Sequence, residues 1–232
     1  YHPRIAAQQS FIYERLQQHE KDAFNRLYNH YFYERHNQFW YDCAMEKLPE
    51  LCEAAPMLPC GEDLGMVPDC VPWVMNELQL LSLEIERMPK NPQHEFGNVE
   101  WYPERSVCTI GTHDMATFRG WWREDYSQTC RYYYDVLRFG GEVPGEAPGW
   151  VCEEVVRKHL NCPSMLSILA LQDWFAMDEQ LRYSDVDAER INVPANPRHY
   201  WRYRMHLSIE SLLQQVAFNQ RITNMVEQSG RQ

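Results

Sequence analysis

The chain has 232 residues, of which 44% are hydrophobic, so it can form a folded core and is not a wholly disordered protein. Its formal net charge is −11 and it has no long basic run, which argues against nucleic-acid binding, because that binding depends on Lys and Arg neutralising phosphates. No stretch of about 18 consecutive apolar residues occurs, so the sequence predicts no membrane-spanning helix and no membrane partner.

The eight cysteines are spread along the chain, with no CxxC pair and no matching histidine cluster. This spacing predicts no zinc site. The even count leaves a disulfide framework open. Cys108, however, lies within the apolar run 106–110, as a buried reduced thiol would. We therefore favour reduced thiols and a cytoplasmic protein.

The N-terminal part of the chain is predicted to be mainly helical. Residues 1–18 are expected to form a loop with a short helix. From Asp22 to about Ala55, apolar residues recur at the three- and four-residue spacing of a helix. Pro49 is expected to break or restart this helix. A further helix is predicted to start at 68–69.

Short apolar segments alternate with helices and loops in the rest of the chain. The predicted strands are apolar runs, at 57–60, 81–85, 107–110 and 165–171. The predicted helices lie at about 128–139, 150–160 and 205–228. Strands that alternate with helices in this way predict an α/β fold with a parallel sheet. Because eight strands close a (β/α)8 barrel, four strands correspond to about half of one.

Polar side chains follow the ends of three predicted strands: Glu62, His113 with Asp114, and Gln172 with Asp173. In a (β/α) barrel the active site lies at the carboxyl ends of the strands. Chemistry at a glycosidic bond needs two carboxyl groups, one that gives a proton to the leaving oxygen and one that stays ionised. Glu62 and Asp114 are the best candidates, because a strand end fixes the position of a side chain.

Each of these positions also has a purely structural interpretation. The segment 61–65 can equally be a turn with a helix-capping acid, and Asp114 can equally cap a helix by accepting backbone N–H bonds. The chain is rich in aromatic residues, which suit both sugar binding and an ordinary core. Trp121 and Trp122 fit core packing better than a sugar platform.

Several motifs together resemble glycoside hydrolase family 77, the amylomaltases or disproportionating enzymes. The segments that carry the resemblance are 59–68, 111–114 with 120–122, 171–173, 191–194 and 200–202. They occur in the order that the family has, and the resemblance extends from about residue 20 to about residue 225. Two further segments, 86–89 and 196–204, are similar to the plant cytosolic disproportionating type.

The resemblance implies a retaining double displacement that needs no cofactor. It assigns Glu62 as the general acid/base and Asp114 as the transition-state stabiliser. His113, Gln172 and Asn192 are its implied substrate contacts. The implied partners are maltose or malto-oligosaccharide donors and α-1,4-glucan acceptors. Met115 and Ala116 replace the family's usual Asn and acid, which leaves the sugar contacts just beyond Asp114 open.

The family's nucleophile is an aspartate in an Arg-x-Asp motif at the end of an earlier strand, and we find no such strand-end motif here. We therefore expect the nucleophile in an upstream part of the same polypeptide and expect the 232-residue chain alone to be inactive. Residues 1–55 are predicted to be a helical segment that precedes the half-barrel. Residues 56–232 are predicted to be the C-terminal half of a (β/α)8 catalytic domain.

Two other functions stay open. The chain can be a non-catalytic glucan-binding or structural region, in which Glu62 and Asp114 only cap helices. It can also belong to an α-glucan hydrolase, in which water replaces the acceptor sugar.

Overall fold

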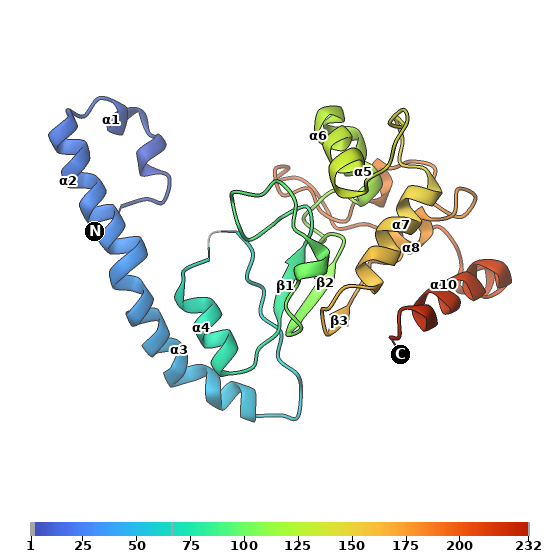
Figure 1. Ribbon diagram of the computed structural model, residues 1–232, viewed down its shortest axis with the longest axis horizontal. Helices are drawn as coiled ribbons and strands as arrows, with labels where there is room; N and C mark the ends of the chain where they lie inside the picture. Colours follow the sequence, from blue (N-terminus) through green and yellow to red (C-terminus); the bar gives the residue numbers. More distant parts are fainter. Residues whose placement is uncertain (1–2, 66, 232) are drawn as a thin grey trace. The chain divides into compact units, whose positions relative to one another are not determined.

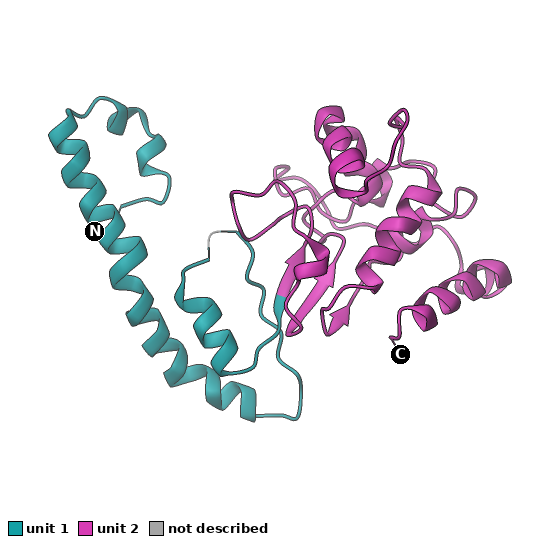
Figure 2. Cartoon of the chain, in the orientation of Figure 1, with its two compact units in different colours: residues 1–82 teal, residues 83–232 magenta. Residues whose placement is uncertain are grey.

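The chain divides into two compact units, residues 1–82 and 83–232 (Figure 2). The computed structural model describes residues 3–65 and 67–231 (Figure 1). The assignment of residues 56–232 to one catalytic half-barrel, preceded by a helical segment, stays a prediction.

The first unit is built mainly from helices. These are η1 (Ala7–Gln9), α1 (Phe11–Glu14), α2 (Gln18–Asn29), α3 (His36–Glu53) and α4 (Cys70–Glu77). A π-helical turn, η2 (His30–Arg35), connects α2 to α3 without a break. The predicted break at Pro49 is wrong, because α3 continues to Glu53. Pro49 has no N–H to donate to the Met45 carbonyl, so α3 continues through Pro49 with one backbone hydrogen bond fewer.

Three short strands form one sheet in the order β1–β2–β3 (Figure 1). They are β1 (Ser82–Ile85), β2 (Ser106–Thr109) and β3 (Leu166–Ser167). β2 and β3 run parallel, with Val107 opposite Leu166. Every residue of the central strand β2 is buried. The strands predicted at 81–85 and 107–110 are confirmed to within one residue.

The other two predicted strands are shorter than the sequence suggests. The run 57–60 contributes an isolated parallel bridge between Cys60 and Leu81. Pro59 accepts a hydrogen bond from the Leu81 N–H but has no N–H of its own to donate, which limits the ladder there. The last residue of the run 165–171 is the first residue of helix α8 (Leu171–Ala176). Pattern alone cannot tell whether a short apolar run forms a strand or part of a helix. The described residues thus hold three strands and a bridge instead of four strands.

The remaining helices of the second unit surround its core. They are α5 (Phe118–Glu124), α6 (Tyr126–Arg131), α7 (Gly149–Leu160), α9 (Ile209–Leu213) and α10 (Val216–Gln228). Shorter turns are η3 (Val99–Trp101), the π-helical η4 (Tyr132–Val136) and η5 (Asp187–Glu189). The single helix predicted over 205–228 is two helices, because Gln215 leaves helical geometry with ψ 63°. Within the described residues, none of the helices combines the length and apolar character needed to cross a bilayer.

Aromatic side chains form much of the core of the second unit. Trp122, Tyr132 and Phe175 are almost completely buried there. Trp121 is buried beside them, and the indole N–H groups of Trp121 and Trp122 donate to Gln128 and to the Pro144 carbonyl. Both tryptophans therefore pack in the core, as the sequence favoured. All eight cysteines lie in the described part of the chain, and each is a free thiol.

Candidate active site

The loop that follows β2 presents His113 and Asp114 to solvent. Their side chains are 48% and 51% exposed, and 3.3 Å separates His113 Nε2 from Asp114 Oδ1. The Met115 N–H donates to the Thr112 carbonyl over 3.1 Å and closes a turn around the pair. The next helix, α5, is capped by the side chain of Thr117, which accepts from the Gly120 N–H. Asp114 is therefore not the cap of α5.

Asn192 reaches this loop from a distant part of the chain. Its side-chain Nδ2 donates to Asp114 Oδ1 over 2.6 Å, across 78 residues of sequence. Its backbone N–H donates to the His113 carbonyl over 3.1 Å. The structure thus brings together three of the predicted site residues, His113, Asp114 and Asn192. A carboxylate that accepts such bonds is fixed in orientation while its remaining lone pairs stay available.

Gln172 lies beneath the same loop. Its side chain is buried, and Nε2 donates to the Glu189 carbonyl over 3.2 Å. Gln172 and His113 line a common cavity of about 60 Å³. This volume holds a few water molecules and is too small for a sugar ring. Gln172 supports the segment around Glu189 in this structure, and its role as a substrate contact stays a prediction.

Glu62 belongs to the first unit, whereas the other four predicted site residues belong to the second. It follows the bridge at Cys60, where the Gly61 N–H donates to the Leu81 carbonyl over 2.8 Å. Its side chain is exposed. Helix α4 has Asp69 at its N-cap, so Glu62 does not cap it.

Arg87 holds both ends of the loop that carries His113 and Asp114. Its guanidinium donates to the Ile110 carbonyl, with Nη2 at 3.0 Å, and to the Ala116 carbonyl, with Nη1 at 3.2 Å. Gly111 allows this approach, because a Cβ there would lie 2.5 Å from Arg87 Nη2. Arg87 is the second residue after β1, so the strand-end rule that selected Glu62 and Asp114 also applies to it. Sequence reasoning gave it no role.

Asp173 is a buried acid beside this clamp. Its Oδ2 accepts from the Ala170 N–H over 3.1 Å, at the start of α8. Burial raises the pKa of the Asp173 carboxyl to about 6, although the charge of Arg87 and the bond from Ala170 oppose the rise. Burial also lowers the pKa of the Arg87 guanidinium, and Asp173 counteracts that effect.

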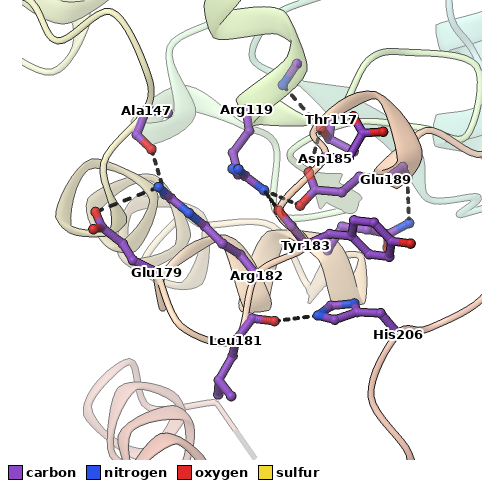
Figure 3. A network of polar contacts seen from close by, with 12 residues as sticks. Thr117, Arg119, Ala147, Glu179, Leu181, Arg182, Tyr183, Asp185, Glu189 and His206 are labelled. Atoms are coloured by element: carbon purple, nitrogen blue, oxygen red, sulfur yellow. Dashed lines mark hydrogen bonds and ion pairs between the residues drawn. The ribbon is translucent and has the colours of Figure 1, made fainter.

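A buried ion pair between Arg119 and Glu189 fixes the chain segment that precedes Asn192 (Figure 3). Arg119, on α5, pairs with Glu189 and also donates to the Tyr183 carbonyl over 2.8 Å. The Thr117 hydroxyl donates to the second carboxylate oxygen of Glu189 over 3.2 Å. Burial raises the pKa of Glu189 more than Arg119 lowers it. Because η5 ends at Glu189, shortly before Asn192, these contacts position the amide that holds Asp114.

Trp201 places a flat aromatic surface next to His113. The two ring centroids are 5.0 Å apart at an interplanar angle of 44°. Trp201 is 61% exposed, so much of its ring is open to solvent beside His113. Its contact with His113 joins residues that are distant in sequence, so local sequence pattern gives no signal for it. The resemblance of the motif 200–202 to the family assigned Trp201 no role.

Comparisons with known proteins agree on one family. Residues 10–209 match the family model described as 4-alpha-glucanotransferase. The chain is 38% identical over 231 residues to 4-alpha-glucanotransferase DPE2 of Oryza sativa subsp. japonica, covering 100% of this chain and 24% of that protein. It is 28% identical over 181 residues to the 4-alpha-glucanotransferase of Chlamydia caviae, covering 77% of this chain and 34% of that protein. The chain therefore spans between about a quarter and a third of these relatives.

Solved structures give the same likeness of fold. An amylomaltase from Streptococcus agalactiae in complex with acarbose aligns with a TM-score of 0.58 at 19% identity, over 79% of this chain and 35% of that one. An amylomaltase from Corynebacterium glutamicum aligns with a TM-score of 0.56 at 16% identity, over 77% of this chain and 29% of that one.

Proposed function

The chain belongs to the 4-alpha-glucanotransferase family, and from this membership we propose that its protein transfers glucosyl or α-1,4-glucan units from maltose or malto-oligosaccharide donors to glucan acceptors. The observation that carries the proposal is the exposed Asp114 carboxylate in the loop after β2, held by Asn192 and flanked by His113. A fixed, solvent-facing carboxylate beside an imidazole and an aromatic ring suits a neutral, hydroxyl-rich substrate better than a charged one.

The proposed mechanism is a retaining double displacement without a cofactor. Glu62 donates a proton to the leaving glycosidic oxygen and then takes a proton from the attacking hydroxyl of the acceptor. Asp114 stabilises the positive charge that develops on the sugar ring in the transition state, and Asn192 keeps the Asp114 carboxylate oriented. His113 and Gln172 contribute hydrogen bonds to the sugar. The aspartate that attacks the anomeric carbon belongs to a segment upstream of this chain.

We propose that residues 56–232 form the C-terminal half of a (β/α)8 catalytic domain. The parallel pairing of β2 with β3, the polar residues after β1 and β2, and the likeness to amylomaltases support this assignment. Because the nucleophile lies outside it, the 232-residue chain alone is inactive. The eight free thiols support a cytoplasmic location, where disulfides are rare.

Substitution of the two carboxyl groups tests the function in the protein as its gene encodes it. We expect Glu62→Gln and Asp114→Asn each to lower transfer from maltose to glycogen by at least a hundredfold, because each removes a group needed in the transition state. Glucose release and growth of the glucan measure the reaction. Glu100→Gln, at an exposed carboxylate on η3, is the matched control and should keep full activity. Near-normal transfer by Glu62→Gln contradicts its acid/base role.

The same assay separates transfer from hydrolysis. A transferase lengthens the acceptor glucan as it releases glucose from maltose, whereas a hydrolase releases glucose with no longer product. Glucose as the sole product would replace the proposed transferase with an α-glucan hydrolase.

A further inference from the structure

Two thiols of the second unit are in contact with each other in its interior. Cys108 lies within β2, and Cys162 lies in the loop between α7 and β3. Their Sγ atoms are 3.2 Å apart, although the two residues are 54 positions apart in sequence. They pack with Val99 and Tyr102 in a small cluster of buried side chains. The mechanism proposed above uses neither thiol, so the pair calls for a separate explanation.

Hydrogen bonds hold the two segments that carry these thiols side by side. The Met165 N–H donates to the Glu104 carbonyl over 2.8 Å. The hydroxyls of Ser106 and Ser164 hydrogen-bond to each other over 2.7 Å. Parallel pairing of β2 with β3 continues this contact (Figure 1). Because an S–S bond is about 2.05 Å long, the two sulfur atoms need to approach each other by only about 1 Å to form one.

Arg231 makes the surroundings of Cys162 electropositive. Its Nη2 lies 3.6 Å from Cys162 Sγ, and the same guanidinium donates to the Leu160 and Ser164 carbonyls over 2.6 and 2.8 Å. Hydrogen bonds from Cys108 and Ser164, together with the charge of Arg231, lower the pKa of the Cys162 thiol, although burial opposes this effect. Contact with Cys162, together with burial, raises the pKa of the Cys108 thiol. The two thiols are therefore unequal, and Cys162 is the one that forms a thiolate, which is the reactive form of cysteine.

We propose that Cys108 and Cys162 are a redox-sensitive pair that hydrogen peroxide converts reversibly into a disulfide. Cys162 keeps 7% of its surface exposed and Cys108 keeps none, so the oxidant reaches Cys162 first. Peroxide is small enough to enter where a bulky disulfide reagent is excluded. Disulfides of cytosolic proteins are typically transient and redox-sensing, so the free thiols of this structure are the resting state of the pair.

The oxidation proceeds in two steps. The Cys162 thiolate attacks one oxygen of the peroxide, the O–O bond breaks, hydroxide leaves, and Cys162 becomes a sulfenic acid. The sulfur of Cys108 then attacks the sulfur of Cys162, the S–O bond breaks, and the oxygen leaves as water with the proton of the Cys108 thiol. When the proton that Cys162 released is counted, two thiols lose two electrons and one peroxide becomes two water molecules. A dithiol reverses the reaction by reducing the disulfide.

Peptide mapping without reduction tests the proposal after hydrogen peroxide treatment of the protein as its gene encodes it. We expect a linked pair of peptides that contains Cys108 and Cys162 and that separates after treatment with dithiothreitol. Cys152 should remain a thiol, because burial raises its pKa to about 12 and so suppresses its thiolate. Peroxide that oxidises the exposed Cys60 and leaves Cys108 and Cys162 as thiols overturns the proposal.

Single substitutions separate the roles of the two thiols. In Cys108→Ser, the sulfenic acid of Cys162 has no partner thiol, so a dimedone probe should label it and excess peroxide should oxidise it to sulfinic acid. In Cys162→Ser, dimedone labelling of Cys108 should be about tenfold weaker, because Cys108 stays protonated. Cys152→Ser, at another buried thiol, is the matched control and should form the Cys108–Cys162 link in the same yield as the unsubstituted protein. Equal labelling of Cys108 and Cys162 in the two single variants contradicts the proposed order of attack.

Discussion

At the scale of single residues, Gly111 shows how one missing side chain controls the position of the loop with Asp114. Gly111→Ala should displace the Arg87 guanidinium, because the added Cβ would lie 2.5 Å from Nη2. We expect a loss of about 1–3 kcal/mol in the free energy of unfolding and a fall in transfer activity of about tenfold. Thermal unfolding and initial rates measure both effects.

Gly145→Ala is the matched control for this substitution, because a Cβ at Gly145 would meet no atom within 4 Å. Equal stability and activity of the two variants would show that Arg87 can hold the loop from another position.

Asp173 gives the protein a specific dependence of stability on pH. Its pKa is raised from 3.8 to about 6 by burial, so the native state binds its proton more tightly than the unfolded state does. The contribution of the protonated carboxyl is complete below about pH 4 and is lost as the pH rises through about 6, a change of about 3 kcal/mol. Asp173→Asn should remove this component. Urea unfolding at several pH values measures it, and parallel curves for the two proteins would contradict it.

At the scale of structural elements, the buried Arg119–Glu189 pair joins α5 to the segment that carries Asn192. Glu189→Gln leaves the Arg119 charge buried without its partner, so we expect a loss of about 3–5 kcal/mol in the free energy of unfolding. Glu95→Gln breaks the exposed Arg131–Glu95 pair, and we expect a loss below about 1 kcal/mol. Chemical denaturation compares them. Similar losses in both variants would contradict the role of burial.

The sequence predicted helices and strands best where apolar residues recur over a long segment or where successive residues are all buried. The alternation of apolar residues located β1, a short apolar run located β2, and the spacing of Val151, Val155 and Val156 located α7. The run 165–171 is a strand only over β3 (Leu166–Ser167), and its last residue begins α8, where Asp173 Oδ2 accepts from the Ala170 N–H. The π-helical turn η2 carries no distinct spacing in so short a segment.

The candidate site could be predicted only in part for a related reason. The strand-end rule selects single residues, and it located His113 and Asp114. Asn192 entered through the family resemblance, because its bond to Asp114 joins residues 78 positions apart. Trp201 and the clamp by Arg87 also depend on contacts between distant segments, which local pattern does not encode.

At the scale of the whole molecule, the edge of the sheet affects whether the 232-residue chain self-associates when it is produced alone. β3 lies at one edge of the sheet, and the residues around it expose apolar side chains, among them Met165 and Ile168, which is 59% exposed. Apolar surface at a sheet edge favours pairing with another chain. We therefore expect the 232-residue chain to self-associate at micromolar concentration, as measured by light scattering.

Ile168→Lys should shift the chain toward monomers, because it places a charge in the surface that would be buried on association. Leu213→Lys, at a position 70% exposed on α9, is the control and should leave association unchanged. If the proposed barrel is correct, an upstream strand or loop covers this edge in the protein as its gene encodes it, so Ile168→Lys there should reduce stability and not association. A monomeric chain with native-like unfolding would instead indicate that β3 needs no neighbour.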